Sequence, residues 1–116
     1  MINLDKFFSK QYDSRDYNCS HFVRDVWLEL AGTDLAGILC AWNSGKLDEA
    51  MRHRKDLIKL DKPVEPCIVL FQKPNTPPHA AIWTDGNVFH LTDGGARLDD
   101  FDCVSQCYSK WNFYLC

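Results

Sequence analysis

The clearest hydrophobic pattern in the chain is a stripe of apolar residues that follows Cys19. Between Cys19 and Ala31 the apolar side chains recur at intervals of three and four, the spacing of one buried face of an α-helix. Asn18 is a typical N-cap residue, and Gly32 is of the type that commonly ends a helix. The pattern predicts a core-facing helix over residues 19–31. Its apolar face consists of Phe22, Val23, Val26, Trp27 and Leu30.

Short apolar runs and turn residues dominate the second half of the chain. Residues 67–71 (CIVLF) are typical of a fully buried strand, and residues 111–115 predict a final strand. Between them, Asp85 and Gly86 separate two further runs with a dipeptide that strongly favours a two-residue hairpin turn. Helices that come first and strands that follow predict an α+β fold, with N-terminal helices on a small antiparallel sheet.

Two other segments have weaker helical patterns. Residues 4–8 predict a short N-terminal helix or turn, and residues 35–60 predict a mostly helical segment with Ile58 on its apolar face. Pro63 and Pro66 then break the pattern. We therefore expect helix up to these prolines and strands after them.

Length and composition indicate one soluble domain over residues 1–116. The chain is 46% hydrophobic and 25% charged, as in ordinary globular proteins. A net charge of −3 gives no basic surface for nucleic acid, and no apolar run approaches the roughly 20 residues of a membrane span. The N-terminal residues lack a signal-peptide core, so we expect synthesis in the cytoplasm without an export signal.

The six cysteines are expected to be reduced. A disulfide framework suits small secreted chains with little core, whereas this composition allows an adequate core. Cys103 and Cys107 could form a redox pair. A zinc site is not expected, because the chain has no CxxC pair and no matching histidine pair near these two cysteines. The sequence predicts no metal and no cofactor.

Cys19 stands out because it opens the predicted helix. A thiol at a helix N-terminus feels the positive end of the helix dipole, which favours the thiolate. The backbone N–H groups of the first turn, including that of Ser20, lack partners within the helix and could stabilise an oxyanion. Cys19 is therefore a candidate nucleophile.

The predicted hairpin supplies two histidines on one face of the sheet. With the turn at Asp85 and Gly86, Ala81 lies opposite His90. His79 shares a face with Ala81, so His90 is the diagonal neighbour of His79, at roughly 7–8 Å between Cα atoms. A thiol nucleophile needs a base and a group that orients the base. Cys19, His79 and His90 can fill these roles in that order.

These residues also resemble the sequence boxes of the NlpC-type cysteine peptidases in the papain-like superfamily. Residues 17–23 (YNCSHFV) are similar to the family's Asp-Cys-Ser-Gly-Phe-Val box at a helix start, and residues 65–71 (EPCIVLF) to its Pro-Gly-Asp-Leu-Val-Phe-Phe strand. Residues 79–83 (HAAIW) and 89–91 (FHL) follow its two histidine strands. The resemblance covers under half of the chain and implies a papain-like NlpC-type fold.

The chain departs from the family pattern at the cysteine box. Asn18 replaces the usual acid, and His21 replaces the usual glycine. Family members often supply an upstream tyrosine to the oxyanion hole, and the resemblance suggests Tyr12 here. Gln11 and Tyr17 are rivals for this role. His21 lies off the apolar stripe, so we expect it on the surface.

The resemblance implies that the protein cleaves an amide bond in peptidoglycan stem peptides. Such domains occur in bacterial wall hydrolases and in phage tail proteins, so a phage or prophage tail component that associates with the virion or reaches the periplasm is one expectation. The alternatives are a non-catalytic module of the same fold and a thiol acyltransferase or deamidase. Residues 18–23 also look like the cysteine box of the lecithin:retinol acyltransferase-like proteins. In those proteins the functional histidine precedes the cysteine in the chain, whereas here the cysteine comes first.

Overall fold

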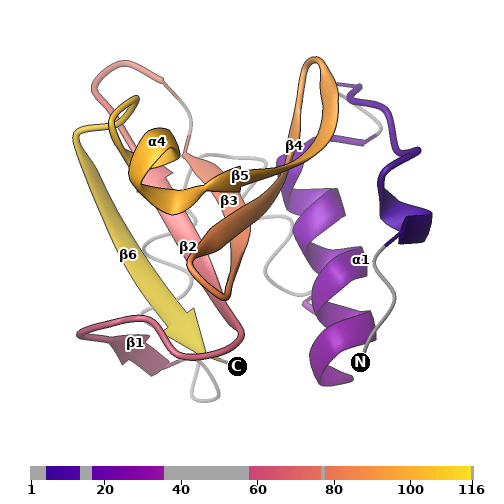
Figure 1. Cartoon of the computed structure of the whole chain (residues 1–116), viewed down its shortest axis with the longest axis horizontal. Coiled ribbons are helices and arrows are strands. Elements are labelled where there is room, and N and C mark those ends of the chain that lie inside the picture. Colours follow the sequence, from indigo (N-terminus) through magenta and orange to yellow (C-terminus); the bar gives the residue numbers. More distant parts are fainter. Residues whose placement is uncertain (1–4, 14–16, 36–57, 77, 116) are drawn as a thin grey trace.

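The part of the chain that the structure describes combines a long helix with a six-stranded antiparallel sheet. The computed structural model describes residues 5–13, 17–35, 58–76 and 78–115. Their elements, in chain order, are η1 (Asp5–Phe7), α1 (Cys19–Ala31), β1 (Ile58–Leu60), β2 (Cys67–Gln72), β3 (His79–Thr84), β4 (Asn87–Thr92), β5 (Gly95–Asp100), α4 (Phe101–Ser105) and β6 (Lys110–Leu115). The strands follow the order β1-β6-β2-β3-β4-β5, and α1 lies alongside the sheet (Figure 1).

Helix α1 begins and ends where the sequence predicts. The Asn18 side chain caps its N-terminus and accepts a hydrogen bond from the backbone N–H of Ser20 at 3.0 Å. Gly32 takes the left-handed conformation at φ 74°, which its lack of a Cβ permits, and its N–H donates to the carbonyl of Leu28 at 3.0 Å. Among the described residues, no helix is long and apolar enough to cross a membrane.

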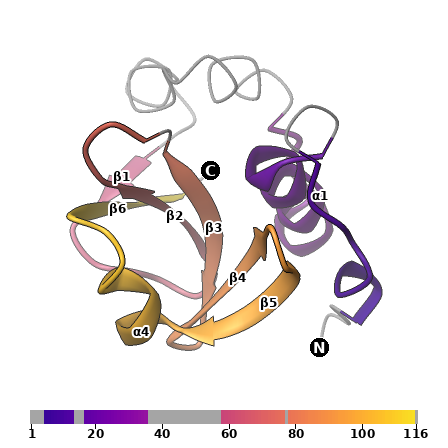
Figure 2. The ribbon, with the colours of Figure 1, turned by 90° about the horizontal axis from the view of Figure 1, so that it is seen from above.

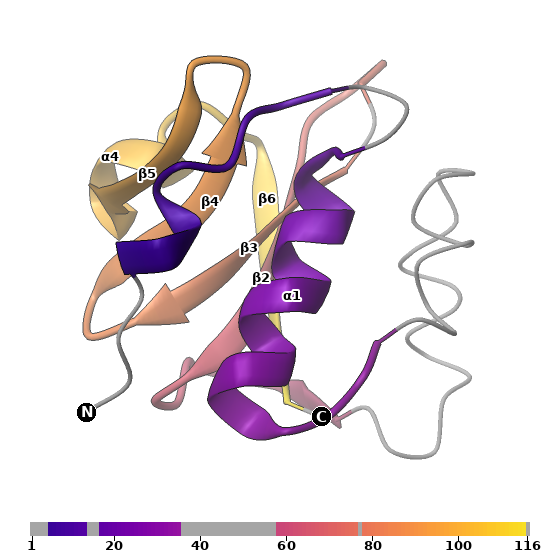
Figure 3. The same cartoon turned by 90° about the vertical axis from the view of Figure 1, so that its right-hand side faces the viewer.

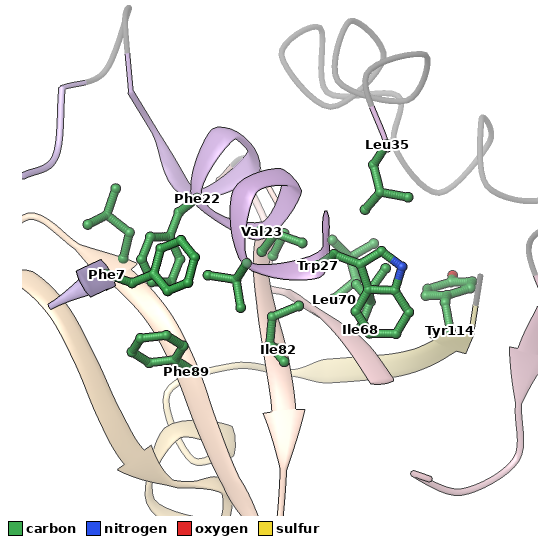
Figure 4. Close-up of a cluster of buried hydrophobic side chains, with 13 residues drawn as sticks. Phe7, Phe22, Val23, Trp27, Leu35, Ile68, Leu70, Ile82, Phe89 and Tyr114 are labelled. Carbon is green, nitrogen blue, oxygen red and sulfur yellow. The ribbon is translucent and has the colours of Figure 1, made fainter. Parts of the chain in front are cut away.

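The main core fills the space between α1 and the sheet. Phe22 and Val23 of α1 are fully buried, as are Ile82 of β3 and Phe89 of β4 (Figure 4). The rings of Phe22 and Phe89 meet edge to face, with centroids 5.0 Å apart. Each such side chain contributes roughly 1.5–3 kcal/mol by leaving water. This packing fixes α1 across β3 and β4, and Figure 3 shows the helix running beside them.

The other face of the sheet carries a second cluster of buried side chains. Ile68 and Leu70 of β2 face α1, whereas Val69 and its alternate neighbours face away, as the period of a strand requires. Helix α4 contributes Val104 to this second cluster. Figure 2 shows α1 and α4 on opposite sides of β3 and β4. The cluster consists of Cys67, Val69, Phe71, Ala81, Val88, Val104 and Phe113.

The β3–β4 hairpin has the predicted two-residue turn. Thr84 pairs with Asn87, and Ile82 pairs with Phe89. Asp85 and Gly86 both have positive φ values, 50° and 77°, which suits a type I′ turn and the twist of the flanking strands. The register predicted from the sequence is therefore confirmed at these pairs. The predicted strands over residues 67–71 and 111–115 are confirmed as β2 and β6.

The helical prediction for the middle of the chain is wrong at its C-terminal end. Ile58 and Leu60 belong to strand β1, where they pair with Leu115 and Phe113 of β6. The hydrogen bonds of this edge strand override a local helical pattern that ran into it. Residues 36–57 of the predicted segment lie outside the described residues, and so do Leu4 and the cysteines at positions 40 and 116.

Candidate active site

Cys19 lies where the first turn of α1 meets β3. Its side chain is partly buried at the margin of the main core. The β3–β4 pairing covers residues 82–84 and 87–89, so Ala80 lies beyond the paired part of the hairpin. There the backbone N–H of Ala80 interacts with the Cys19 sulfur and favours its charged form. The diverging strands thus let the helix N-terminus reach the residue next to His79.

His79 and His90 form the pair that the hairpin register predicts. The Nε2 atom of His79 lies 2.9 Å from Nδ1 of His90, which is hydrogen-bonding distance. Their ring centroids are 5.1 Å apart, and the small Ala81 shares their face of the sheet. His90 is 5% exposed, whereas His79 keeps partial exposure. His79 is therefore the more accessible of the two imidazoles.

Two aromatic rings hold the imidazole of His79. The ring of Tyr108 lies parallel to it, at an interplanar angle of 3° and 5.9 Å between centroids. Phe71 stacks on the same imidazole at 6.3 Å and on Tyr108 at 5.0 Å. Burial raises the pKa of the Tyr108 phenol, and the charges of Cys107 and, to a smaller extent, Cys19 add to the increase. Tyr108 thus stacks on His79 and interacts electrostatically with Cys19.

The polar chain continues from His90 into β5. Nε2 of His90 lies 2.9 Å from Oδ2 of Asp99. Arg97 donates from Nε to the same oxygen at 3.0 Å and from Nη2 to Oδ1 at 3.2 Å. The Arg97 hydrogen bond and the contact with His90 hold the pKa of the Asp99 carboxyl below its ordinary value, so the group is ionised at neutral pH.

Burial keeps both histidines neutral. It lowers the pKa of His79 to about 3, and the nearby His90 adds to the decrease. Burial also lowers the pKa of His90, although Asp99 acts in the opposite direction. Desolvation disfavours the charged imidazole in each case. At pH 7 the pair therefore consists of two neutral rings.

The Cys19 thiol is neutral for the same reason. Burial raises its pKa above the ordinary value, while the backbone N–H groups of Ala80, Cys19 and Ser20 oppose the increase. A proton acceptor within the site is therefore needed to form the thiolate at neutral pH. His79 is the neutral imidazole placed next to Ala80.

The two departures from the family box fit together as a helix cap. The backbone N–H of Asn18 donates to Nδ1 of His21 at 3.1 Å, which completes a capping box with the Asn18 side chain. His21 is half-buried and stacks on Tyr17 at 6.0 Å between centroids. His21 therefore keeps part of its surface exposed, as expected, while its ring completes the cap at the start of α1.

The predicted oxyanion-hole residues lie in different surroundings. Ser20 is buried, and its backbone N–H already donates to Asn18. Tyr12 is 42% exposed, and the hydroxyl of its rival Tyr17 donates to Asp25 at 2.6 Å. Tyr108, which had no signal in the sequence, is a phenol that stacks on His79 and interacts electrostatically with Cys19. The roles of Tyr12 and Ser20 stay predictions.

The other described cysteines differ from Cys19 in their surroundings. Cys19, Cys67, Cys103 and Cys107 are all free thiols. Cys67 is buried in the second cluster, which raises its pKa to about 11, and Cys103 and Cys107 are exposed. Within the described residues, no group of three or more His, Cys, Asp or Glu side chains is arranged to hold a metal ion.

The structure adds Asp99 and Tyr108 to the residues chosen from the sequence. Asp93 and Gly94 form a second two-residue turn, and His90 pairs with Arg97 across it. Asp99 is then the diagonal neighbour of His90, by the same rule that relates His79 to His90. The Asp93-Gly94 turn was therefore the sequence signal from which the position of Asp99 next to His90 could have been predicted. Tyr108 follows a short helix and had no such local signal.

The helix, the sheet and the contact of Cys19 of α1 with β3 belong to an α+β fold of the NlpC/p60 type. Among solved structures, the chain is similar to the NlpC/p60 domain of the peptidoglycan hydrolase SagA, with a TM-score of 0.58 and 17% sequence identity. The match covers 97% of this chain and 91% of that domain structure. No protein-family model and no curated protein matches the sequence. The expected papain-like NlpC-type fold is confirmed.

Proposed function

We propose that the protein is a cysteine hydrolase that cleaves an amide bond in peptidoglycan stem peptides through a thioester at Cys19. The observation that carries this proposal is the meeting of a helix-start thiol with the strand that bears His79, whose Nε2 lies 2.9 Å from His90. Cys19 is the nucleophile, His79 the proton acceptor and His90 the group that orients it.

The first half of the reaction forms the thioester. The Cys19 sulfur attacks the carbonyl carbon of the amide while its proton passes to His79. The backbone N–H of Cys19, at the N-terminus of α1, stabilises the negative oxygen of the tetrahedral intermediate. His79 then gives the proton to the amide nitrogen, the C–N bond breaks, and the amine leaves.

The second half consumes one water molecule. His79 takes a proton from water as the oxygen attacks the thioester carbon. The C–S bond breaks, the proton returns to the Cys19 sulfur, and the acid is released. Each turnover therefore converts one amide and one water into one amine and one acid, and the enzyme returns to its neutral form.

The choice of substrate rests on the fold. The similar solved domain belongs to a peptidoglycan hydrolase, and the match covers 91% of that domain structure. A stem peptide offers amide bonds in a short, unfolded chain, so that a partly buried nucleophile can reach them without unfolding a protein substrate. The predictions of a phage-tail role and of delivery to the virion or the periplasm stay predictions.

Incubation with purified muropeptides tests the function. We expect mass spectrometry to show two fragments whose masses sum to that of the substrate plus water. A stable acyl group passed to an added amine instead of water would indicate an acyltransferase. Muropeptides that stay intact would indicate a non-catalytic module of the same fold.

The proposed mechanism also predicts a wide pH range of activity. The site holds one proton shared between Cys19 and His79, and the pH profile is the same whichever atom carries it. As the pH falls, the site takes up a second proton only near the lowered pKa of His79, about 3. As the pH rises, the site loses its shared proton only above the ordinary pKa of a thiol, because burial raises the pKa of Cys19. We therefore expect kcat/KM to stay level from well below pH 6.5 to beyond the usual thiol range.

A pH series of kcat/KM on one stem peptide, with folding checked by circular dichroism at each pH, measures this range. An acid limb centred at the unperturbed histidine pKa of about 6.5 would contradict the prediction. Such a limb would mean that the acceptor of the Cys19 proton is a solvated imidazole, unlike His79, which packs against Phe71 and Tyr108.

A further inference from the structure

A continuous chain of polar contacts leads from the candidate base into the far edge of the sheet. His79 contacts His90 through Nε2 and Nδ1, and His90 contacts Asp99 through Nε2 and Oδ2, each at 2.9 Å. Three neighbouring strands, β3, β4 and β5, supply one member each. Each neutral ring has one N–H donor and one acceptor nitrogen. All donors in such a chain of hydrogen bonds must therefore point the same way along it.

The carboxylate at the end of this chain sets the direction. An ionised carboxylate only accepts hydrogen bonds. Nε2 of His90 must therefore carry the proton that points at Asp99. A neutral imidazole has one N–H, so Nδ1 of His90 is an acceptor.

The same reasoning then fixes His79. Nε2 of His79 faces the acceptor Nδ1 of His90, so it must be the donor in their 2.9 Å contact. The neutral ring of His79 consequently keeps a lone pair on Nδ1, its remaining nitrogen. A lone pair on that atom is what a base needs to receive the thiol proton.

We propose that Asp99 is a positioning residue that forces His90 and His79 into the Nε2–H tautomer and so leaves Nδ1 of His79 ready to accept the proton of Cys19. The tautomers follow from the contacts alone. Their consequence for the Cys19 proton rests on the proposed function. The orienting group of the site is then a His90–Asp99 unit.

Arg97 holds the carboxylate in place. Its two donors bind both oxygens of Asp99, which leaves the shared Oδ2 aimed at His90. The Arg97 side chain itself is 62% exposed, whereas that of Asp99 is 27% exposed and that of His90 is 7% exposed. We therefore assign the tautomer control to the carboxylate and a supporting role to the cation.

Nuclear magnetic resonance of ¹⁵N-histidine-labelled protein measures the tautomers directly. Long-range ¹H–¹⁵N spectra distinguish a protonated ring nitrogen from an unprotonated one, and spectra of His79→Gln and His90→Gln assign the signals. In the wild-type protein near neutral pH we expect both rings to carry their proton on Nε2. A proton on Nδ1 of His79 would overturn the inference, whatever the variants do.

Asp99→Asn tests the cause with almost no change in shape. The amide can donate as well as accept, so we expect the Nδ1–H form to appear and the ¹⁵N shifts of the two nitrogens in each ring to converge. Alkylation of Cys19 by iodoacetamide, located by peptide mass spectrometry, should slow by at least about tenfold. Unchanged shifts in this variant would contradict the inference.

Two matched variants separate tautomer control from general effects. Arg97→Gln removes the cation but keeps the carboxylate, so the wild-type tautomers should persist. Asp93→Asn makes the same chemical change at an exposed position in the β4–β5 turn and should alter neither the shifts nor the alkylation. If muropeptides stay intact but the tautomers are as expected, the proposed function fails while the assignment of Asp99 holds.

Discussion

Cys19→Ala is expected to lower kcat/KM for stem-peptide cleavage by roughly 10⁴-fold or more, because it removes the thiol that forms the thioester. The substitution removes one partly buried sulfur at the start of α1. It leaves the Asn18 cap in place, so the fold should persist. Fragment release measured by mass spectrometry over time, with purified wild type alongside, gives the ratio.

Cys103→Ala is the matched control for this variant. It removes a free thiol that is exposed on α4. We expect its kcat/KM to stay within about twofold of wild type, as for surface substitutions generally. Equal activity of Cys19→Ala and Cys103→Ala would remove Cys19 from the mechanism and leave the site without a nucleophile.

The parts of the site that the sequence predicted are those encoded by local patterns. Helix α1 is specified by an apolar stripe, by Asn18 before it and by Gly32 after it, all within a few residues of one another. The pairing of His79 with His90 follows from one turn and the two-residue period of strands. In both cases the information lies in a short segment, so it can be extracted without tertiary structure.

The parts that escaped prediction depend on contacts between distant segments. Strand β1 has a helical pattern, and only its pairing with β6 makes it a strand. Strand β5 is largely exposed at the edge of the sheet, so its residues lack the apolar alternation that marks a half-buried strand. Tyr108 reaches His79 only because α4 turns the chain back over the sheet.

The site also shows how a weak sequence resemblance can be judged by physical consistency. Asn18 and His21 depart from the family box, yet together they build the capping box that holds the turn with Cys19. The two departures from the family sequence therefore keep the helix start that carries Cys19. At 17% identity the similarity to a solved domain establishes the fold, and the chemistry must be tested on this chain's own residues.

His79→Ala is expected to lower kcat/KM by roughly 10²- to 10⁴-fold, the range for loss of a general acid and base. Burial raises the pKa of the Cys19 thiol, so without an acceptor it stays protonated at neutral pH. Alkylation of Cys19 by iodoacetamide at neutral pH should then become slower than that of a free model thiol. In the wild-type protein it should be faster, because His79 takes up the proton as the sulfur attacks the reagent.

Added imidazole distinguishes the loss of a proton acceptor from a loss of structure in this variant. The substitution opens a space beside Phe71 and Tyr108, which stack on the native ring at 6.3 and 5.9 Å. Free imidazole that enters this space should restore part of the alkylation rate in His79→Ala but not the activity of Cys19→Ala. A His79→Ala protein that alkylates as fast as wild type would show that the Cys19 thiolate forms without His79, and the proposed division of roles between thiol and imidazole would be wrong.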